Sequence, residues 1–333
     1  MLNTFGVDMS GKKMNFSLTQ LEYAMAVHRY GHFAKAAEAC FVTQPTLSMQ
    51  IQKLEEELGA IIFDRSKKPI LLTQMGKKLI EQMQVVLFEA KKIGSIIQQD
   101  KKGTKQGSLV MGIIPTIAPY LLPRLLPVCE NLFPDIELQI KEMQTSQILK
   151  ALDDDEIDVG LLATPTQMNK MFEYALFYEP FYVLCEKKHD YAQLKKVKYQ
   201  SLGMEDIWLL EEGHCLRNQI LDICSTRRGK GVQRRYKFES GSLETLKNLV
   251  NQYGGYTLLP SLATENIGSR SQLVPFERPI PAREVGLVYR REHYKSELIE
   301  ALGEAILKCI PEELRKIRPK DLDVLPIAES DRR

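Results

Sequence analysis

Apolar positions between residues 17 and 73 fall into three blocks with helical spacing, followed by two short extended runs. Ser17 and Gln20 form a capping-box pattern ahead of the first block, and Tyr30-Gly31-His32 interrupts the spacing after it. The third block predicts a helix with one buried face, made by Leu47, Ile51, Leu54 and Leu58. The pattern therefore predicts three helices and a hairpin, the arrangement of a winged helix-turn-helix.

The outward side of the third predicted helix carries amides and hydroxyls that can read base edges, whereas cations suit phosphates. Thr43 can cap this helix, and Pro45 is tolerated in its first turn. The basic tip of the hairpin could be an ordinary solvated turn, but its position after a recognition helix favours phosphate contact. The candidate DNA-binding residues are Thr43, Gln44, Pro45, Thr46, Ser48, Lys53, Arg65, Lys67 and Lys68.

Residues 74–98 form one long helical pattern with lysines between its apolar positions. We interpret the apolar stripe as a dimer seam, because an exposed helix of this length needs a partner. Packing onto its own domain is the alternative, and a polar, lysine-rich linker is expected at residues 100–107. The stripe consists of Leu79, Met83, Val86 or Leu87, Ala90, Ile93 and Ile97.

From Ser108 onward, strand-like and helix-like runs alternate, which predicts a parallel sheet with helical crossovers. Strands are predicted at 109–114, 137–141 and 159–162, with helices after Pro119 and near Ile148. The apolar run at 181–185 leads into a second α/β unit that spans roughly residues 168–269. The chain then returns to the first unit.

Charge is divided unevenly along the chain. Residues 1–107 hold 15 Lys and Arg against 10 Asp and Glu, whereas residues 108–333 hold 30 against 33. The basic part is the part predicted to bind DNA. A signal peptide is not evident, and apolar runs fall short of the roughly 18 residues that span a membrane. We expect a cytoplasmic protein with no membrane partner.

The candidate chemistry lies at Cys215, with a second thiol at Cys224. His214 and Arg217 place positive charge near the Cys215 sulfur, which favours the thiolate that attacks peroxide. The sulfenic acid so formed needs another thiol to become a disulfide. Taken alone, Cys224 in its apolar run is more often a buried packing residue. We interpret the other cysteines as packing residues: Cys40, Cys129, Cys185 and Cys309.

The spacing of Cys215 and Cys224 has a mechanical consequence. If residues 216–225 are helical, as their apolar spacing indicates, the two sulfurs lie about 14 Å apart on opposite helix faces. A disulfide tolerates a Cα separation of only about 4.4–6.8 Å. Oxidation is therefore expected to unwind or refold this segment.

Residues 17–76 resemble the DNA-binding domain of LysR-type transcriptional regulators, through Phe33-Ala34-Lys35-Ala36-Ala37 and Gln44-Pro45-Thr46-Leu47-Ser48. Over nearly all of residues 14–309 the chain is similar to the hydrogen-peroxide sensors of that family. Further motifs that carry this similarity are Gly213-His214-Cys215-Leu216-Arg217, Ser242-Leu243-Glu244-Thr245-Leu246 and Leu258-Leu259-Pro260. Met49 and Gln52 depart from the arginines often found in the recognition helix of the family, so the operator sequence is not implied.

The resemblance implies a fold that combines an all-α winged helix-turn-helix, a long linker helix and a two-lobed α/β domain of the periplasmic-binding-protein type. The expected boundaries are an extension at 1–13 that is disordered or precedes a true start at Met14, the DNA-binding domain at 14–73, the linker and dimerisation helix with its hinge at 74–107, the regulatory domain at 108–309, and a C-terminal tail at 310–333.

The resemblance also implies roles for the site residues. Cys215 is the peroxide-reactive thiol and Cys224 its disulfide partner, while Thr116, Thr145 and His214 hold and polarise the peroxide with help from Arg217. Helix capping is the competing interpretation of the two threonines. The implied partners are operator DNA, hydrogen peroxide, RNA polymerase, a dimer of dimers and a cellular thiol reductant such as glutaredoxin or thioredoxin. No cofactor and no metal are expected.

Two other functions compete with a peroxide-switched activator or repressor. A LysR-type regulator that responds to a small metabolite in the interlobe cleft would leave the cysteines incidental. A thiol peroxidase would use the same sulfur chemistry, but it has no use for the DNA-binding residues, so we do not expect an enzyme.

Overall fold

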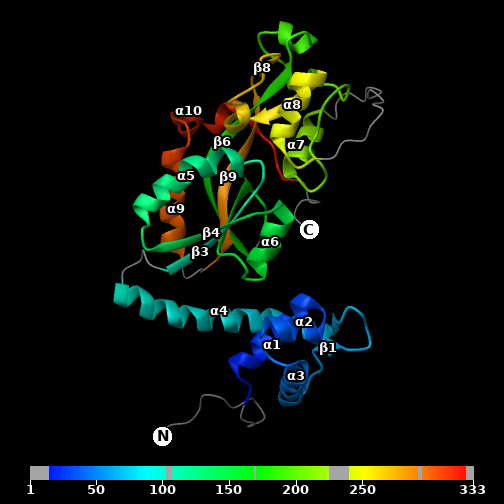
Figure 1. The fold of residues 1–333 in the computed structure, drawn as a ribbon, viewed down its shortest axis with the longest axis vertical. Helices are drawn as coiled ribbons and strands as arrows, with labels where there is room; N and C mark the ends of the chain where they lie inside the picture. Colours follow the sequence, from blue (N-terminus) through cyan, green and yellow to red (C-terminus); the bar gives the residue numbers. More distant parts are fainter. Residues whose placement is uncertain (1–14, 103–106, 169, 225–239, 292–294, 328–333) are drawn as a thin grey trace. The chain divides into compact units, whose positions relative to one another are not determined.

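The computed structural model describes residues 15–102, 107–168, 170–224, 240–291 and 295–327 (Figure 1). The chain divides into two compact units, Met1–Lys101 and Lys102–Arg333. The expected extension at 1–13 lies outside the described residues. So does the segment 225–231 after Cys224, which holds Arg227, Arg228 and Lys230.

The first unit has the predicted helices and hairpin. Ser17 caps the first helix in a capping box, and its amide donates to the Gln20 side chain at 2.9 Å. Gly59 ends the third helix with φ 64°, a left-handed conformation that favours glycine. The elements are α1 (Leu18–Tyr30), α2 (Phe33–Ala39), α3 (Gln44–Leu58), β1 (Phe63–Asp64), β2 (Leu71–Leu72) and α4 (Gln74–Lys102).

Helix α4 differs from the sequence prediction in length and in the role of its stripe. It continues to Lys102 because no glycine or proline interrupts the chain between Ile97 and Gly103. Met83 is buried in the core of the first unit, with Leu79 and Leu87 packed against that core. This part of the stripe therefore packs onto its own domain, as the alternative interpretation of the sequence had it, and does not form a dimer seam. Val86 and Ile93 stay exposed, and the Ile97 side chain lies outside the described residues.

The second unit is built on a mixed sheet with the strand order β4-β3-β5-β9-β6-β7. The predicted parallel core is confirmed, because β3 pairs in parallel with both β4 and β5. Its elements are β3 (Gly107–Ile113), α5 (Ala118–Leu132), β4 (Ile136–Glu142), α6 (Thr145–Asp153), β5 (Val159–Thr164), β6 (Met171–Glu186), α7 (Cys215–Cys224), α8 (Leu243–Tyr253), β7 (Tyr256–Pro260), β8 (Ser271–Pro275), β9 (Ile280–Arg290) and α9 (Ser296–Cys309).

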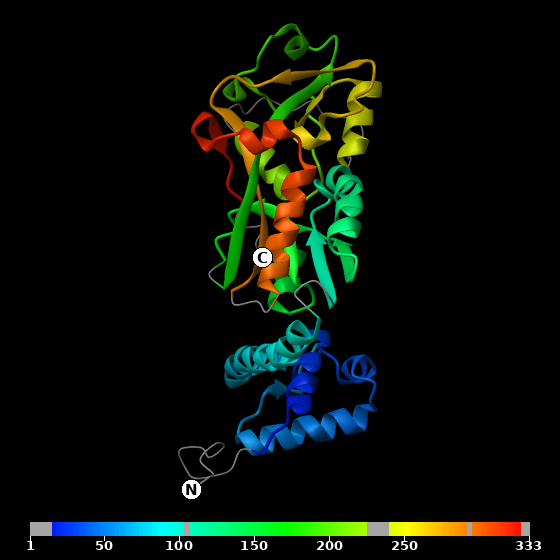
Figure 2. The same cartoon turned by 90° about the vertical axis from the view of Figure 1, so that its left-hand side faces the viewer.

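Two long antiparallel strands, β6 and β9, join the two lobes of this unit (Figure 2). One hydrophobic core lies among β3, β5, α5 and α9, and another among the far half of β6, α7, α8 and β7. The two-lobed architecture expected from the sequence is therefore confirmed. Strands β7 and β8 pair antiparallel with β6, so the second lobe does not repeat the parallel pairing of β3 with β4 and β5 in the first.

The chain after residue 309 is part of the regulatory fold up to residue 327, whereas the sequence analysis treated 310–333 as a tail. Helix α10 (Glu312–Lys316) is followed by β10 (Leu322–Val324), which pairs in parallel with β9. Leu314 and Ile327 are buried in the core of the first lobe. The sequence of this segment is polar, so its pairing with β9 is a tertiary effect that local pattern does not show.

Candidate functional site

Helix α3 presents the face that the sequence assigns to DNA. Leu47, Ile51 and Leu54 are fully buried, which fixes the rotation of the helix about its axis. Thr43 caps the helix, and its hydroxyl lies 2.8 Å from that of Thr46. Of the nine candidate DNA-binding residues, Ser48 is half-buried and the others are exposed.

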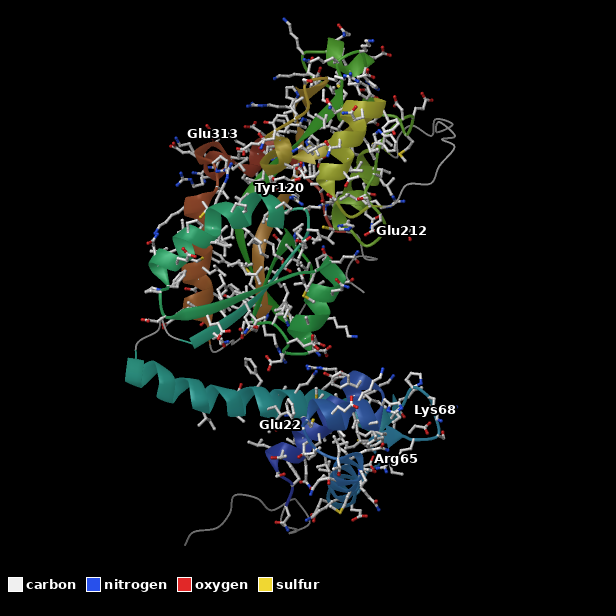
Figure 3. All side chains as sticks on the ribbon, viewed as in Figure 1. Glu22, Arg65, Lys68, Tyr120, Glu212 and Glu313 are labelled. Carbon is white, nitrogen blue, oxygen red and sulfur yellow. The ribbon has the colours of Figure 1, made fainter. Side chains whose placement is uncertain are left out.

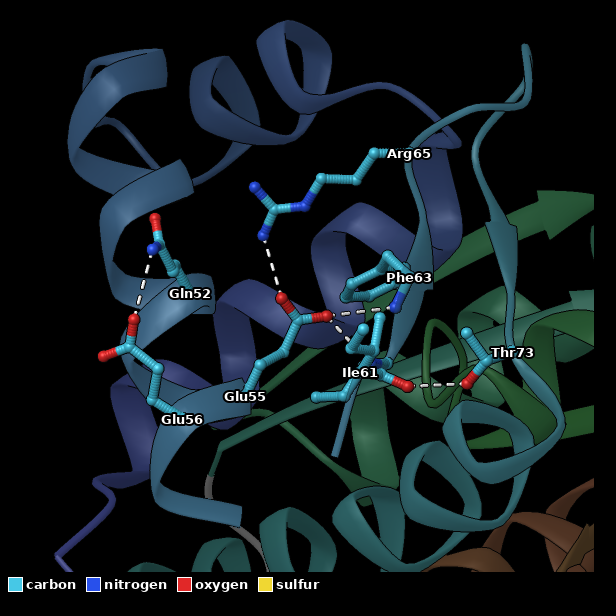
Figure 4. Close-up of polar contacts among 8 residues, drawn as sticks. Gln52, Glu55, Glu56, Ile61, Phe63, Arg65 and Thr73 are labelled. Carbon is cyan, nitrogen blue, oxygen red and sulfur yellow. Dashed lines mark hydrogen bonds and ion pairs between the residues drawn. The ribbon is translucent and has the colours of Figure 1, made fainter. Parts of the chain in front are cut away.

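The hairpin of β1 and β2, which we call the wing, is hydrogen-bonded to α3 through the carboxylate of Glu55 (Figure 4). Its Oε1 accepts from the amides of Ile62 and Phe63 at 2.8 and 3.1 Å, and its Oε2 accepts from Arg65 at 2.9 Å. The Arg65 guanidinium also lies 5.2 Å from the centre of the Phe33 ring. Arg65 thus positions the wing. Lys67 and Lys68 are left exposed at its tip, where Figure 3 labels Lys68.

The segments that carry the predicted peroxide site meet at one cavity of about 410 Å³ between the lobes. His214 lines it directly; Pro115 and Gln144 line it as the neighbours of Thr116 and Thr145. Thr116, Thr145, His214 and Cys215 are all buried. A hydrogen bond of 2.9 Å from the Tyr120 hydroxyl to Glu244 joins α5 to α8, and both residues line the cavity.

A buried ion pair between Arg283 and Glu179 holds the Thr116 hydroxyl in place. Arg283 on β9 donates to the Thr116 hydroxyl at 2.8 Å and lies 2.8 Å from Glu179 on the paired strand β6. Both charged side chains are fully buried. Since the Thr116 oxygen accepts from Arg283, the hydroxyl keeps its own hydrogen for donation to another oxygen.

Close packing at two glycines shapes the surroundings of His214. Gly213 has φ 91°, and a Cβ there would lie 2.5 Å from Gln144 Oε1. A Cβ on Gly241 would lie 2.8 Å from His214 Nε2. This ring nitrogen is also 3.6 Å from the Glu211 carboxylate. A larger residue at Gly213 would displace the Gln144 side chain, and one at Gly241 would displace the His214 ring.

His214 and the chain neighbours of Thr116 and Thr145 line one cavity, whereas Arg217 does not line it. Arg217 Nη1 donates to the Leu210 carbonyl at 2.8 Å. This bond fastens the loop ahead of α7 and supports Cys215 through the backbone. The roles assigned to these side chains from the sequence remain predictions.

The two thiols belong to different hydrophobic cores. Cys215 opens α7 and packs with the first lobe, whereas Cys224 ends α7 and packs within the second. Helix geometry separates their Cα atoms by about 14 Å, as the predicted helix required. Burial raises the pKa of the Cys224 thiol to about 11. The helix start at Cys215 favours an anion there, because the first-turn amides point toward it.

Sequence reasoning missed the Arg283–Glu179 pair and the Tyr120–Glu244 contact. A usable signal existed for the first. Glu179 is the one charged residue between Tyr174 and Cys185, and a buried charge requires a partner. Arg283 gives a weaker signal, because Glu284 follows it directly. The second contact joins exposed side chains 124 positions apart and leaves no pattern in the sequence.

Among the described residues, no group of three or more His, Cys, Asp or Glu side chains is arranged to hold a metal ion. Within the described ranges, the helices are too short or too polar to cross a membrane.

Comparison with known proteins matches residues 18–77 to the bacterial regulatory helix-turn-helix protein family, lysR type, and residues 102–308 to the LysR substrate binding domain. The chain is 39% identical over 276 residues to the hydrogen peroxide-inducible genes activator of Haemophilus influenzae, covering 82% of this chain and 90% of that protein. It is 38% identical over 292 residues to the DNA-binding transcriptional dual regulator OxyR of Escherichia coli, covering 87% and 94%.

Solved structures agree with these matches. A full-length OxyR variant from Pseudomonas aeruginosa superposes with a TM-score of 0.72 at 34% identity, covering 89% of this chain and 96% of that one. An H2O2-bound OxyR mutant from Corynebacterium glutamicum gives 0.58 at 30% identity, covering 90% and 94%.

Proposed function

Because this chain belongs to the LysR family of DNA-binding regulators, we propose that hydrogen peroxide switches its transcriptional output through Cys215 and Cys224. The observation that carries the proposal is the placement of Cys215 at the start of α7. It follows His214, which lines a cavity bounded on the other lobe by the segment of Thr116. The relative from Haemophilus influenzae that is named a hydrogen peroxide-inducible genes activator supports it.

The first chemical step is attack by the Cys215 thiolate on one peroxide oxygen. A sulfur–oxygen bond forms, the oxygen–oxygen bond breaks, and the departing hydroxide takes a proton to become water. Thr116 can donate its hydroxyl hydrogen to a peroxide oxygen while Arg283 holds the hydroxyl in place. His214 beside the thiol stabilises the developing negative charge when it is protonated.

The second step joins Cys224 to the Cys215 sulfenic acid and cannot occur within intact α7. The separation of about 14 Å is at least twice the Cα distance that a disulfide permits. Closing a loop of this size contributes about 3 kcal/mol, whereas moving a two-state protein from 1:99 to 99:1 takes about 5.5 kcal/mol. The redox couple supplies the remainder, since about 30 mV corresponds to 1.4 kcal/mol.

Further partners belong to the same proposal. A symmetric oligomer, a dimer of dimers, would read paired half-sites, and RNA polymerase would receive the output. The protein would act in the cytoplasm, where its target DNA lies and where glutaredoxin or thioredoxin would reset the disulfide. The sulfur chemistry would then be one signalling event and not enzymatic turnover.

The size of the interlobe cavity favours a second candidate function. A volume of about 410 Å³ exceeds what one peroxide molecule fills, so a small metabolite could be the effector. A Cys215→Ser protein that still changes its DNA footprint with a metabolite would select this function.

Peptide mass mapping of the peroxide-treated protein tests the thiol pairing. We expect a disulfide that links the peptides of Cys215 and Cys224, with the other four cysteines reduced. A link from Cys215 to any other cysteine would remove Cys224 from the proposed mechanism.

Lys67 in the wing and Gln44 on α3 should affect DNA binding in different ways. Lys67→Ala is expected to weaken binding to every duplex and to lower the salt slope by about one unit, because one phosphate contact is lost. Gln44→Ala should change which sequence is preferred, because an amide at the start of α3 reads base edges. Titrations of specific and scrambled duplexes at two salt concentrations measure both effects.

The control for the lysine variant is Lys188→Ala, which removes an equally exposed charge from the regulatory unit. It should leave the salt slope unchanged. An unchanged slope in Lys67→Ala as well would exclude the wing from DNA contact.

A further inference from the structure

The chain that follows β10 is hydrogen-bonded both to the crossing strand β9 and to α7. The Leu325 amide donates to the Ala282 carbonyl on β9 at 2.9 Å. The Leu325 carbonyl accepts from Gln219 Nε2 at 3.1 Å. Gln219 lies in the middle of α7 and is fully buried. The helix that carries both candidate thiols is therefore bound, through one side chain, to the C-terminal segment (red in Figure 1).

Two apolar side chains anchor this segment in different cores. Leu325 packs in the core of the second lobe, to which α7 also contributes. Ile327 is 1% exposed and packs in the core of the first lobe. Pro326 between them has no amide hydrogen to satisfy, and it favours an extended conformation of Leu325. Residues 322–327, which we call the strap, thus connect the two lobes, as α7 does.

The Gln219 amide is only half satisfied while α7 is intact. Its Nε2 donates to the strap, but its Oε1 is buried without a hydrogen-bond partner in the part of the chain that the structure describes. A buried oxygen that makes no hydrogen bond leaves its desolvation cost uncompensated, and opening α7 to water would remove that cost. Opening would also break the bond to Leu325 and disturb the shared core, which opposes it. The strap therefore acts against the opening of α7.

We propose that the strap is a positioning element for the disulfide step: it keeps α7 closed in the reduced protein, and its release sets the rate at which Cys224 reaches the Cys215 sulfenic acid. This rests on the proposed peroxide switch. In the step itself the Cys224 sulfur bonds to the Cys215 sulfur and the sulfur–oxygen bond breaks. The departing hydroxide combines with the proton released by the Cys224 thiol to give water.

Leu325→Ala shortens the side chain that anchors the strap and leaves the carbonyl that binds Gln219. Because a buried Leu→Ala change weakens packing strongly, the disulfide step should become about tenfold faster. The rate at which peroxide oxidises Cys215 should stay unchanged, because Cys215 packs with the first lobe and Leu325 with the second. The matched control is Leu259→Ala, which deletes the same atoms from a fully buried position of β7 in the same core.

The kinetic experiment follows the full chain after a peroxide pulse, with sulfenic acid trapped by a dimedone probe and the disulfide counted by mass spectrometry after acid quench. Faster disulfide formation in Leu325→Ala but not in Leu259→Ala supports the proposal. An unchanged rate in Leu325→Ala, or an equal acceleration in both variants, overturns it. A wild-type chain that forms no sulfenic acid at Cys215 would overturn the proposed function, and the role of the strap in the disulfide step with it.

Hydrogen exchange of the reduced protein tests the strap without any oxidation, so it separates this proposal from the peroxide switch. Peptides of α7 should exchange about tenfold faster in Leu325→Ala than in the wild-type chain, because local opening of the helix becomes easier. Peptides of α8, which belongs to the same core, should exchange at the wild-type rate. Unchanged exchange in α7, or an equal acceleration in α7 and α8, would show that the strap does not hold α7 and would overturn the proposal.

Discussion

Replacing Cys215 by serine is expected to abolish the response to peroxide completely, whereas Cys224→Ser should let a sulfenic acid accumulate at Cys215. The two thiols differ in their surroundings. Cys215 begins a helix next to His214, but burial raises the pKa of Cys224 to about 11 and keeps it protonated. Sulfenic acid trapping and mass spectrometry of each variant after peroxide treatment measure the outcome.

The control is Cys185→Ser, since burial in β6 also raises the pKa of the Cys185 thiol to about 11. This variant should respond as the wild-type protein does. Should Cys224 prove to be the faster thiol toward an alkylating probe in the reduced protein, the two roles are reversed.

Arg283→Met is expected to lower the free energy of unfolding of the regulatory unit by about 3–5 kcal/mol, because it leaves a fully buried Glu179 carboxylate without its cation. The loss also removes the donor that holds the Thr116 hydroxyl. Trp208 is the one tryptophan in the sequence and lies in the core of the second lobe. Urea denaturation followed by its fluorescence measures the change in the free energy of unfolding.

Arg278→Met provides the comparison for this variant. Arg278 pairs with Asp321 at 3.2 Å, but its side chain is 70% exposed, so its removal should cost only about 0–1 kcal/mol. Adding Glu179→Leu to Arg283→Met should recover much of the loss, because an apolar pair replaces an unpaired charge. A loss below that of Arg278→Met would mean that the pair does not stabilise the crossing of β6 and β9.

Local signals in the sequence were sufficient wherever one residue determines one feature. Ser17 with Gln20 located the start of α1, and Thr43 located that of α3. The helix that separates Cys215 from Cys224 was predicted at 216–225 and lies at 215–224, so its mechanical consequence stands. These features depend on backbone hydrogen bonds between residues close in the chain.

Features that depend on strand register or on tertiary packing could not be predicted. Arg283 meets Glu179 because β9 pairs with β6 in one particular register. The stripe of α4 was periodic, but periodicity does not tell which partner covers it, and Met83 packs into its own unit.

The central claim is that the thiol switch changes how this regulator contacts DNA, and DNase protection of one operator tests it most directly. The operator is selected from random duplexes with the reduced protein, and disulfide formation is confirmed by mass spectrometry before the oxidised sample is used. Because oxidation must refold the helix between Cys215 and Cys224, the protected region should shift between the two redox forms, with Cys215→Ser fixed in the reduced pattern. Identical footprints from the fully reduced and the fully disulfide-bonded protein would contradict the claim.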